Sequence, residues 1–315
     1  MKLSIVATLY HSAMYIPEFL QRISNAAQQL VGDDYELILV NDASPDNSLD
    51  IAVQYSHTNP HLKVIDLSRN FGHHKAMMTG LAHSHGTYVF LLDSDLEEEP
   101  EWLLTFNQLL HTNNVDVVFG VQDERRGQLF EKITGKIFYR LFRLLTGVAQ
   151  PDNIVTARLM TRRYVDALLQ HREREINIGG LWIITGFAQM PTTVHKHSSS
   201  PTTYNIARKF EHLINAITSF SHLPLTIVFY IGIFILIFTF FYIFVVAYRY
   251  LFISQPPSGY TSLVISIWLL AGFIIFAIGL LGIYVAKIFS EVKQRPYTIV
   301  RDIYSSHMRE DGNNE

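Results

Sequence analysis

Over the first 124 residues, short apolar runs alternate with longer segments in which apolar residues recur every three or four positions. The short runs predict five β-strands, at residues 3–9, 35–40, 62–67, 87–92 and 115–121. The longer segments predict helices at residues 13–30, 73–84 and 102–111. Strands that alternate with helices in this way predict an α/β domain with a Rossmann-like, mostly parallel sheet.

Two long apolar segments dominate the second half of the chain. Residues 223–248 and 250–286 contain no Asp, Glu, Lys or Arg, and the apolar core of the second covers residues 261–289. About 20 apolar residues suffice to cross a bilayer, so both segments are predicted to be transmembrane helices. A soluble helix buried on every side is the alternative, and it is disfavoured because a soluble helix of this length is rarely uncharged on every face.

Two basic, amphipathic segments lie between the sheet domain and the apolar segments, at residues 129–145 and 204–220. Each places its apolar residues on one helical stripe, as in a helix that lies on a membrane surface. Ordinary surface helices packed on the domain are the alternative. The predicted organisation is therefore a sheet domain, a segment with two amphipathic helices, two transmembrane helices and a tail, at residues 1–124, 125–222, 223–289 and 290–315 respectively.

The charge of the chain is unevenly distributed. Residues 1–124 hold 5 Lys and Arg against 17 Asp and Glu, whereas residues 125–172 hold 10 against 3. An acidic front half repels a nucleotide unless a metal ion intervenes, and a basic middle attracts phosphates and lipid headgroups. The chain has no Cys, which excludes disulfides and thiolate metal sites.

Carboxylates gather where the predicted fourth strand ends. Asp93, Asp95 and Glu97 alternate, so in an extended segment they point the same way and offer hard oxygens to one divalent cation. A polar strand end followed by an acidic helix start is the alternative. Asp42 follows the second predicted strand, and parallel strands bring it to the same edge as Asp93, where it can accept hydrogen bonds from a base or ribose. The alternative for Asp42 is a helix cap or an Asx-turn.

Several short motifs follow one another in a recognisable order. They are Asn41-Asp42-Ala43-Ser44-x-Asp46, Ser68-Arg69-Asn70-Phe71-Gly72-His73, Asp93-Ser94-Asp95-Leu96-x-x-x-Pro100-Glu101, Phe138-Tyr139-Arg140-Leu141, Arg158-Leu159-Met160 and Ile217-Thr218-Ser219-Phe220-Ser221-x-x-Pro224-Leu225. This set, together with the two apolar segments, resembles the polyprenyl-phosphate glycosyltransferases of the GT-A, family 2 type. That group includes dolichol-phosphate mannose synthase and bactoprenol glucosyltransferase. The resemblance covers about residues 2–289. It implies that residues 1–124 are a nucleotide-sugar-binding GT-A core and that residues 125–222 are an acceptor-side segment.

The resemblance implies an inverting, metal-dependent hexosyltransferase. Such an enzyme moves one sugar from a nucleotide diphosphate sugar, usually a UDP-sugar, to polyprenyl phosphate on the cytoplasmic leaflet. It implies that Asp42 holds the base or ribose, and that Asp93, Asp95 and Glu97 contact Mg²⁺ or Mn²⁺ and the diphosphate. Asp95 is then a catalytic residue, and Arg125 and Lys132 are catalytic residues that meet phosphate groups of donor or acceptor.

Some positions depart from the family pattern. Thr8-Leu9-Tyr10-His11-Ser12 replaces the usual Pro-x-Tyr-Asn-Glu, which leaves Thr8 and Tyr10 as the nucleotide-contacting positions and removes an acid. Thr156 stands where the family has an Asp sometimes proposed as a general base. A polyprenyl phosphate is already an anion, so its attack does not require that base.

The expected partners are the donor, polyprenyl phosphate and a lipid bilayer, with a possible homo-oligomer and no nucleic acid. Basic residues flank the apolar segments on the side of both long termini, which predicts that the catalytic domain and the C-terminus are cytoplasmic. The resemblance implies a multi-pass protein of the bacterial plasma membrane. Two alternatives stay open. One is a family 2 transferase that acts on another lipid or a polysaccharide, and the other is an inert membrane scaffold that retains the fold.

Overall fold

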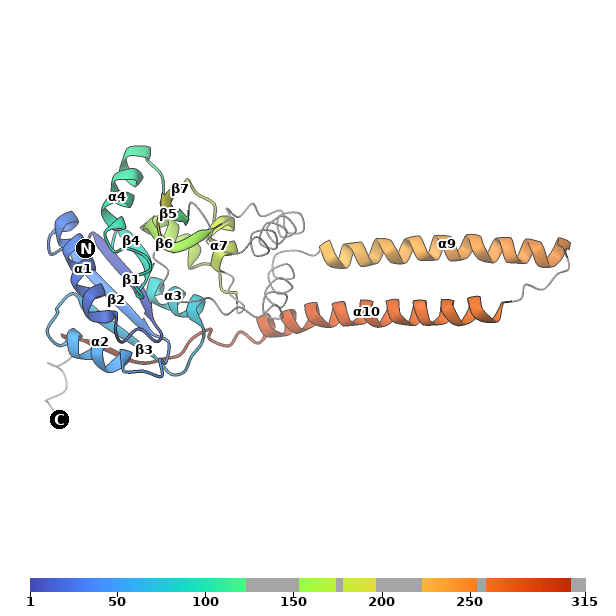
Figure 1. Cartoon of the computed structure of the whole chain (residues 1–315), viewed down its shortest axis with the longest axis horizontal. Coiled ribbons are helices and arrows are strands. Elements are labelled where there is room, and N and C mark those ends of the chain that lie inside the picture. The colour runs from blue at the N-terminus through green and yellow to red at the C-terminus, as the bar shows by residue number, and fades with distance from the viewer. Residues whose placement is uncertain (123–152, 174–177, 197–222, 254–258, 307–315) are drawn as a thin grey trace. The chain divides into compact units, whose positions relative to one another are not determined.

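The computed structural model describes residues 1–122, 153–173, 178–196, 223–253 and 259–306 (Figure 1). Two units can be distinguished. The first contains residues 1–139, 148–204 and 295–315, and the second contains residues 140–147 and 205–294.

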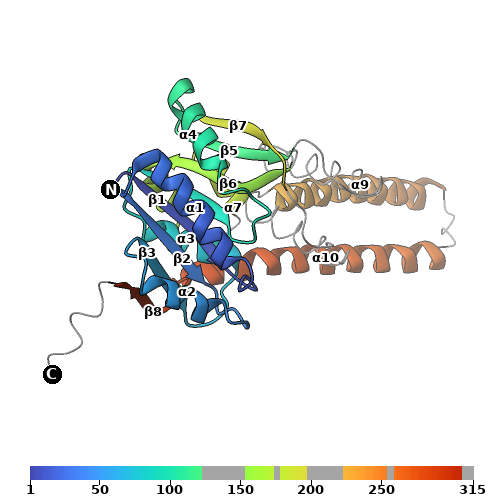
Figure 2. The ribbon, with the colours of Figure 1, turned by 60° about the vertical axis from the view of Figure 1, so that its left-hand side comes forward.

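The first unit is built on an eight-stranded sheet with the order β7-β5-β6-β4-β1-β2-β3-β8 (Figure 2). The strands are β1 (Leu3–Leu9), β2 (Tyr35–Asn41), β3 (Leu62–Leu67), β4 (Tyr88–Asp93), β5 (Val117–Gln122), β6 (Ile154–Thr161), β7 (Gln189–Val194) and β8 (Val300–Ser305). β1 pairs in parallel with β2 and β4, and β2 pairs in parallel with β3. β5 and β7 are also parallel, whereas β6 is antiparallel to β4 and β5, and β8 is antiparallel to β3. The mostly parallel α/β sheet expected from the sequence is confirmed.

The central strands are buried on both faces. Alternate residues of β1 such as Ile5 join one core cluster with Phe19 and Phe106, which come from α1 (Ile16–Val31) and α4 (Trp102–Asn113). The intervening residue Val6 meets α3 (His73–Ala82), where a Cβ on Gly80 would lie 2.4 Å from the Val6 side chain. Strand residues alternate between faces, so helices cover both sides of the sheet.

Local sequence explains the helix ends. α1 begins at Ile16 with a proline in its first turn, where a missing N–H costs nothing. α4 ends before Asn114, which adopts the left-handed conformation with φ of 50° that Asn tolerates. The helix predicted at residues 13–30 thus starts three residues later, and the one predicted at 102–111 runs two residues longer.

The sheet continues beyond the boundary expected at residue 124. β6 and β7 belong to it, together with the short helices α6 (Arg162–Leu168) and α7 (Ile178–Ile184). The tail expected at residues 290–315 also contributes a strand, β8, which pairs with the edge of β3. Helix α2 (Ser48–Ser56), like these later elements, was absent from the sequence prediction.

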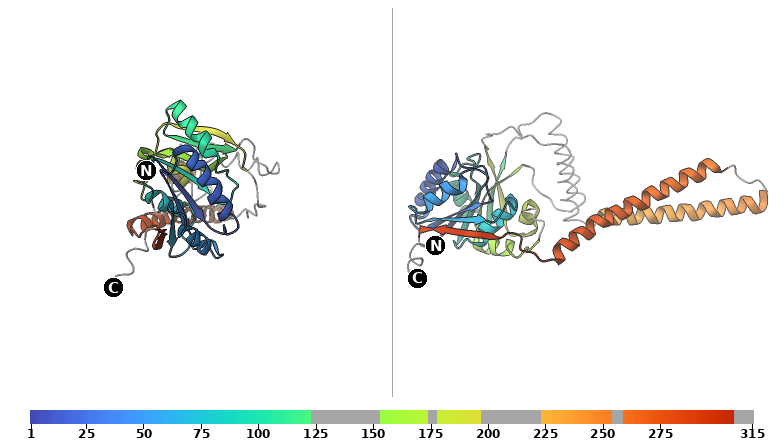
Figure 3. Two further views of the ribbon diagram at one scale, coloured as in Figure 1. Left: turned by 90° about the vertical axis from the view of Figure 1, so that its left-hand side faces the viewer. Right: turned by 90° about the horizontal axis from the view of Figure 1, so that it is seen from below.

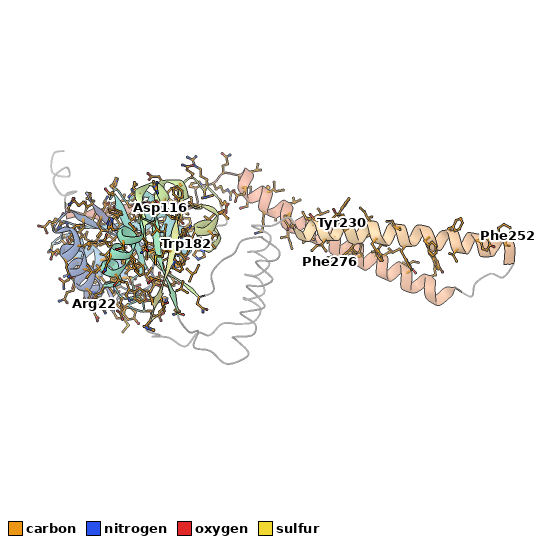
Figure 4. All side chains as sticks on the ribbon, turned by 90° about the horizontal axis from the view of Figure 1, so that it is seen from above. Arg22, Asp116, Trp182, Tyr230, Phe252 and Phe276 are labelled. Carbon is orange, nitrogen blue, oxygen red and sulfur yellow. The ribbon has the colours of Figure 1, made fainter. Side chains whose placement is uncertain are left out.

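The second unit contains two long apolar helices, α9 (Leu223–Ile253) and α10 (Tyr260–Val292). They contact each other, and the right-hand view of Figure 3 shows the two helices inclined to each other. Large apolar side chains point outward, including Tyr230 and Phe276 at 64% and 60% exposure (Figure 4). Within the described residues one segment, Leu270–Val292, is long and apolar enough to cross a membrane. The presence of two transmembrane helices therefore stays a prediction.

The amphipathic segments predicted at residues 129–145 and 204–220 lie outside the described residues.

Candidate active site

A cleft of about 550 Å³ opens at the carboxyl ends of β1, β2 and β4. β1 lies between β2 and β4 in the sheet. The chain places β2 and β3 on one side of β1 and then crosses to the other side to form β4, so the strand order reverses at β1. Open α/β sheets bind ligands at such switch points, and the volume suits a small organic ligand. The lining residues are Thr8, Tyr10, Ser12, Asp42, Asn70, Gly72, His73, Asp93, Ser94 and Asp95.

Asp93, the last residue of β4, is held by side chains from two other elements. Its Oδ2 accepts a hydrogen bond of 2.9 Å from the Thr156 hydroxyl of β6, and its Oδ1 lies 3.1 Å from His73 Nε2 of α3. Burial opposes ionisation of this carboxyl, but His73 keeps the pKa of Asp93 below its ordinary value. Asp93 is therefore an anion at neutral pH.

Asp95 faces the same cleft in a less favourable environment for charge. Its Oδ1 accepts the backbone N–H of Glu97 at 3.0 Å. Burial and the neighbouring charge of Asp93 raise the pKa of Asp95 above its usual value. Two carboxylates so placed repel each other, which is the electrostatic setting that a bound cation relieves.

Glu97 does not line the cleft and is held by Lys196, whose Nζ lies 3.1 Å from Glu97 Oε2. Lys196 follows β7, and its Nζ also lies 3.9 Å from Glu98 Oε1. Although burial opposes the charge on this lysine, Glu98 and Asp93 raise its pKa. The ammonium group of Lys196 thus partly neutralises the carboxylate cluster. The role of Glu97 as a metal ligand stays a prediction.

Glu98 is fully buried and joins the ends of β4 and β6. One of its oxygens accepts the backbone N–H of Asp93 at 3.2 Å, and the other accepts that of Thr156 at 2.8 Å. Burial and the charge of Asp93 raise the pKa of Glu98 to about 8. This carboxyl sets the spacing between Asp93 and Thr156, and the sequence alone gave no reason to separate it from the run of glutamates in which it stands.

Asp42 is buried at the end of β2, and both of its oxygens are occupied. Oδ1 accepts the backbone N–H of Phe71 at 2.7 Å, and Oδ2 accepts that of Gly72 at 2.9 Å. These bonds fix the loop that precedes α3. Asp42 is therefore neither a helix cap nor part of a local Asx-turn, the two alternatives to a binding role. Asp42 lines the cleft as predicted, and its contact with a base or ribose stays a prediction.

Thr8 and Tyr10 line the cleft from the end of β1. Thr8 Oγ1 lies 3.0 Å from His73 Nδ1, while Tyr10 is half exposed and packs edge-on against His11. His73 therefore bridges Thr8 and Asp93. Burial opposes its charge, but Asp93 raises the pKa of His73. Its position at the start of α3 was visible in the sequence, but its two partners come from distant strands.

The carboxylate Asp46 ties together the two loops that flank the cleft. Its Oδ1 accepts the hydroxyls of Ser44 and Ser48, and its Oδ2 accepts the backbone N–H of Ala13 at 3.1 Å. Although burial opposes ionisation, these bonds lower the pKa of Asp46 to about 2. The loops after β1 and β2 are thus joined by one side chain.

Asp46→Ala is expected to destabilise the protein by roughly 1–2 kcal/mol, because it removes the acceptor for both hydroxyls and for the Ala13 amide. Thermal unfolding of the purified protein measures this loss. Asp50→Ala, at an exposed position on α2, is the control and should change the midpoint little. Equal midpoints for both variants would contradict the bridging role.

The donor set of the cleft fits a magnesium or manganese ion shared with a ligand. Within the described residues no group of three or more His, Cys, Asp and Glu side chains forms a complete metal cage. Asp93 and Asp95 nevertheless face one cleft, and the buried Asp93 Oδ1 has no aligned hydrogen-bond donor among those residues. Mg²⁺ commonly takes one or two carboxylates and completes its shell with phosphate oxygens and water. Arg125 and Lys132, the predicted phosphate-binding residues, lie outside the described residues.

The fold and the cleft define a class of protein: an α/β domain with a ligand site at the switch point of its sheet, suited to an anionic ligand held through a cation. The chain belongs to glycosyl transferase family 2, whose profile matches residues 4–169. The GT-A family 2 part of the resemblance seen in the sequence is thereby confirmed.

Full-length relatives support this membership. A protein of Mycobacterium tuberculosis, whose name assigns it to the glycosyltransferases without a substrate, is 47% identical over 98% of this chain and 90% of its own length. The Bacillus subtilis glycosyltransferase YkcC, also named without a substrate, is 32% identical over 96% of this chain and 94% of its own length.

Solved structures with similar folds share less sequence. S. aureus TarS 1–349 in complex with UDP-GlcNAc has a TM-score of 0.44 and 20% identity, over 70% of this chain and 66% of that one. The mannosyltransferase PcManGT from Pyrobaculum calidifontis, in complex with GDP-Man and Mn²⁺, has a TM-score of 0.48 and 19% identity, over 68% and 62%. These scores are too low to transfer a ligand from those proteins to this chain.

Proposed function

We propose that this family 2 glycosyltransferase moves one hexose from a nucleotide diphosphate sugar to polyprenyl phosphate, with inversion at the anomeric carbon. The observation that carries the proposal is the pairing of Asp93 and Asp95 in one cleft at the carboxyl edge of the sheet. A UDP-sugar is the donor that the sequence resemblance favours.

Asp93 and Asp95 would hold Mg²⁺ or Mn²⁺, which when bound neutralises the charge that develops on the departing diphosphate. Thr156, His73 and Glu98 keep the Asp93 carboxylate in place, so its orientation is set before any ligand binds. Preorganised charges of this kind reduce the reorganisation needed in the transition state.

The acceptor phosphate supplies its own nucleophile. A hydroxyl acceptor needs a general base because its pKa lies far above 7, whereas a phosphate oxygen is already anionic. Thr156 stands beside Asp93 and donates a hydrogen bond to it, so this position supports the carboxylate and does not itself accept a proton. Catalysis then depends on charge neutralisation and on alignment of the attacking oxygen.

The acceptor is proposed to be a membrane lipid because the chain carries α9 and α10, whose large apolar side chains are exposed. Apolar surface of this extent calls for cover by lipid or by another protein. We place the protein in the bacterial plasma membrane, with the sheet domain and the C-terminus in the cytoplasm, where nucleotide sugars are available. Arg125 and Lys132 remain the proposed contacts to phosphate groups.

Incubation of membranes that contain the protein with labelled nucleotide sugars and polyprenyl phosphate tests the proposal. Label that becomes extractable into organic solvent only when polyprenyl phosphate is added is the expected result. Label incorporated into polymer instead would favour the polysaccharide alternative, and nucleotide binding without transfer to any acceptor would indicate an inert scaffold. A product lipid with the retained anomer would contradict the single displacement.

Thr156→Val is expected to lower kcat by roughly tenfold, because it removes the hydroxyl that orients Asp93 but preserves the shape of the side chain. Thr156→Ser keeps the hydroxyl and should retain most of the activity. Steady-state kinetics with saturating donor separate the two. If Thr156→Val were as active as the wild type, the hydrogen bond to Asp93 would have no part in catalysis.

A further inference from the structure

The C-terminal strand β8 reaches the loop at residues 68–72, which lies between β3 and α3. β8 pairs antiparallel with β3, with Val300 opposite Leu67. The backbone contact continues one residue further, because the Ser68 N–H donates to the Ile299 carbonyl at 2.9 Å. The tail therefore holds the first residue of this loop.

Arg301 makes the most specific contact between the tail and this loop. Its Nη2 donates to the Ser68 carbonyl at 2.7 Å, and its Nη1 lies 3.4 Å from Asp66 Oδ2. Asp66 is almost completely buried, and its other oxygen accepts a hydrogen bond of 2.8 Å from Asn41 Nδ2. One guanidinium thus connects the loop to the end of β2, next to Asp42.

The other end of the loop lines the candidate donor cleft. Asn70 and Gly72 line it directly, and the Phe71 and Gly72 amides donate to Asp42. A second contact from the tail supports the adjacent helix, because Thr298 Oγ1 lies 2.8 Å from Thr79 Oγ1 of α3. The loop is therefore fixed by Asp42 at its cleft end and by the tail at its β3 end.

We propose that the C-terminal strand supports the donor site. Arg301 is a positioning residue that holds the 68–72 loop in the conformation that lines the cleft. Arg301 is not among the residues that line the cleft, and its contacts are with Ser68 and Asp66. A lysine cannot reproduce its two contacts, because only the planar guanidinium offers donors in a fixed fork. The proposal rests on the proposed function for the identity of the substrate. The effect of Arg301 on the 68–72 loop can be measured without any substrate.

Hydrogen exchange and nucleotide binding on the purified full-length protein test this link. Arg301→Ala is expected to speed exchange in peptides covering residues 68–72 by roughly tenfold, since a hydrogen bond from a charged donor is lost. The affinity for UDP or GDP, measured by calorimetry with Mg²⁺, should fall by about the same factor. The KM for donor should rise correspondingly, while kcat at saturating donor stays close to that of the wild type.

Two further variants make the result specific. Arg301→Lys should recover part of the protection and part of the affinity. Arg295→Ala, which removes an exposed arginine from the same tail, should leave exchange and affinity unchanged. Faster exchange confined to residues 68–72 supports the proposal, whereas faster exchange across the whole sheet would show a general structural role and overturn it.

The outcomes also separate this proposal from the proposed function. Unchanged exchange and unchanged affinity in Arg301→Ala would overturn the role of the tail while leaving the enzyme assignment intact. If the wild-type protein bound neither UDP nor GDP, the donor assignment would fail, and the exchange data alone would still decide whether Arg301 holds the loop.

Discussion

Asp95→Asn is expected to lower the rate of sugar transfer by at least about 100-fold, because it removes one of the two carboxylates that would hold the metal ion against the departing diphosphate. The amide is almost the same size and keeps an oxygen for the Glu97 N–H, which Asp95 accepts at 3.0 Å. It cannot provide the negative charge. Transfer assays at saturating Mg²⁺ or Mn²⁺ measure the loss.

The same substitution should not weaken the fold. Burial and the charge of Asp93 make ionised Asp95 unfavourable in the folded protein, as its raised pKa indicates. Removal of that charge therefore leaves the unfolding midpoint unchanged or slightly higher, as at other sites where function opposes stability. Asp50→Asn, at an exposed position on α2, is the matched control and should keep full activity. Full activity of Asp95→Asn would refute the metal assignment.

Arg158→Ala is expected to produce the largest loss of stability, roughly 3–5 kcal/mol, because Arg158 is a large side chain in the interior of the sheet domain. Its guanidinium stacks on the Trp182 ring and donates to the Thr156 and Val155 carbonyls. Burial lowers the pKa of Arg158 to about 9, but the group still carries its charge at neutral pH. Truncation would leave a cavity beside Trp182 and two carbonyls without their donor.

Thermal unfolding of the purified protein measures this effect, and a loss of about 3 kcal/mol corresponds to a midpoint lowered by roughly 6–12 °C in a domain of this size. Arg158→Met, which fills most of the volume, should cost less. Arg172→Ala removes an exposed arginine and should change the midpoint little. Equal midpoints for Arg158→Ala and Arg172→Ala would show that the buried guanidinium contributes nothing to stability.

The sequence alone predicted the central part of the sheet and the place of the candidate site. The runs that became β1, β2 and β4 are apolar on both faces, and this pattern is typical of parallel strands covered by helices. Since parallel strands end at one edge, Asp42 and Asp93 had to lie close together, and both line the same cleft. The catalytic and binding roles of these residues stay predictions.

The partners of those carboxylates were not predictable from local pattern. His73, Glu98 and Lys196 belong to α3, the loop after β4 and the segment after β7, and each reaches the cluster only through tertiary packing. Arg158 appeared in the sequence as part of a motif, but its burial against Trp182 depends on how β6 and α7 pack. Pairings set by distant segments leave no periodic signal in the chain.

The C-terminal tail illustrates the same limit. β8 is six residues long and mixes charged with apolar residues, so its pattern is weak. Its place in the sheet is determined by the edge of β3, which offers unpaired backbone groups to any strand that can reach it. Sequence order suggested a tail that follows the apolar segments, whereas the structure returns it to the first unit.

The most direct test of the central claim is a crystal structure of the protein with a nucleotide diphosphate sugar and Mn²⁺, with the manganese located by its anomalous scattering. The predicted result is a manganese peak in contact with an oxygen of Asp95 and with the diphosphate, inside the cleft at the ends of β1, β2 and β4. A nucleotide bound elsewhere, or bound in this cleft with the manganese away from Asp93 and Asp95, would contradict the assignment.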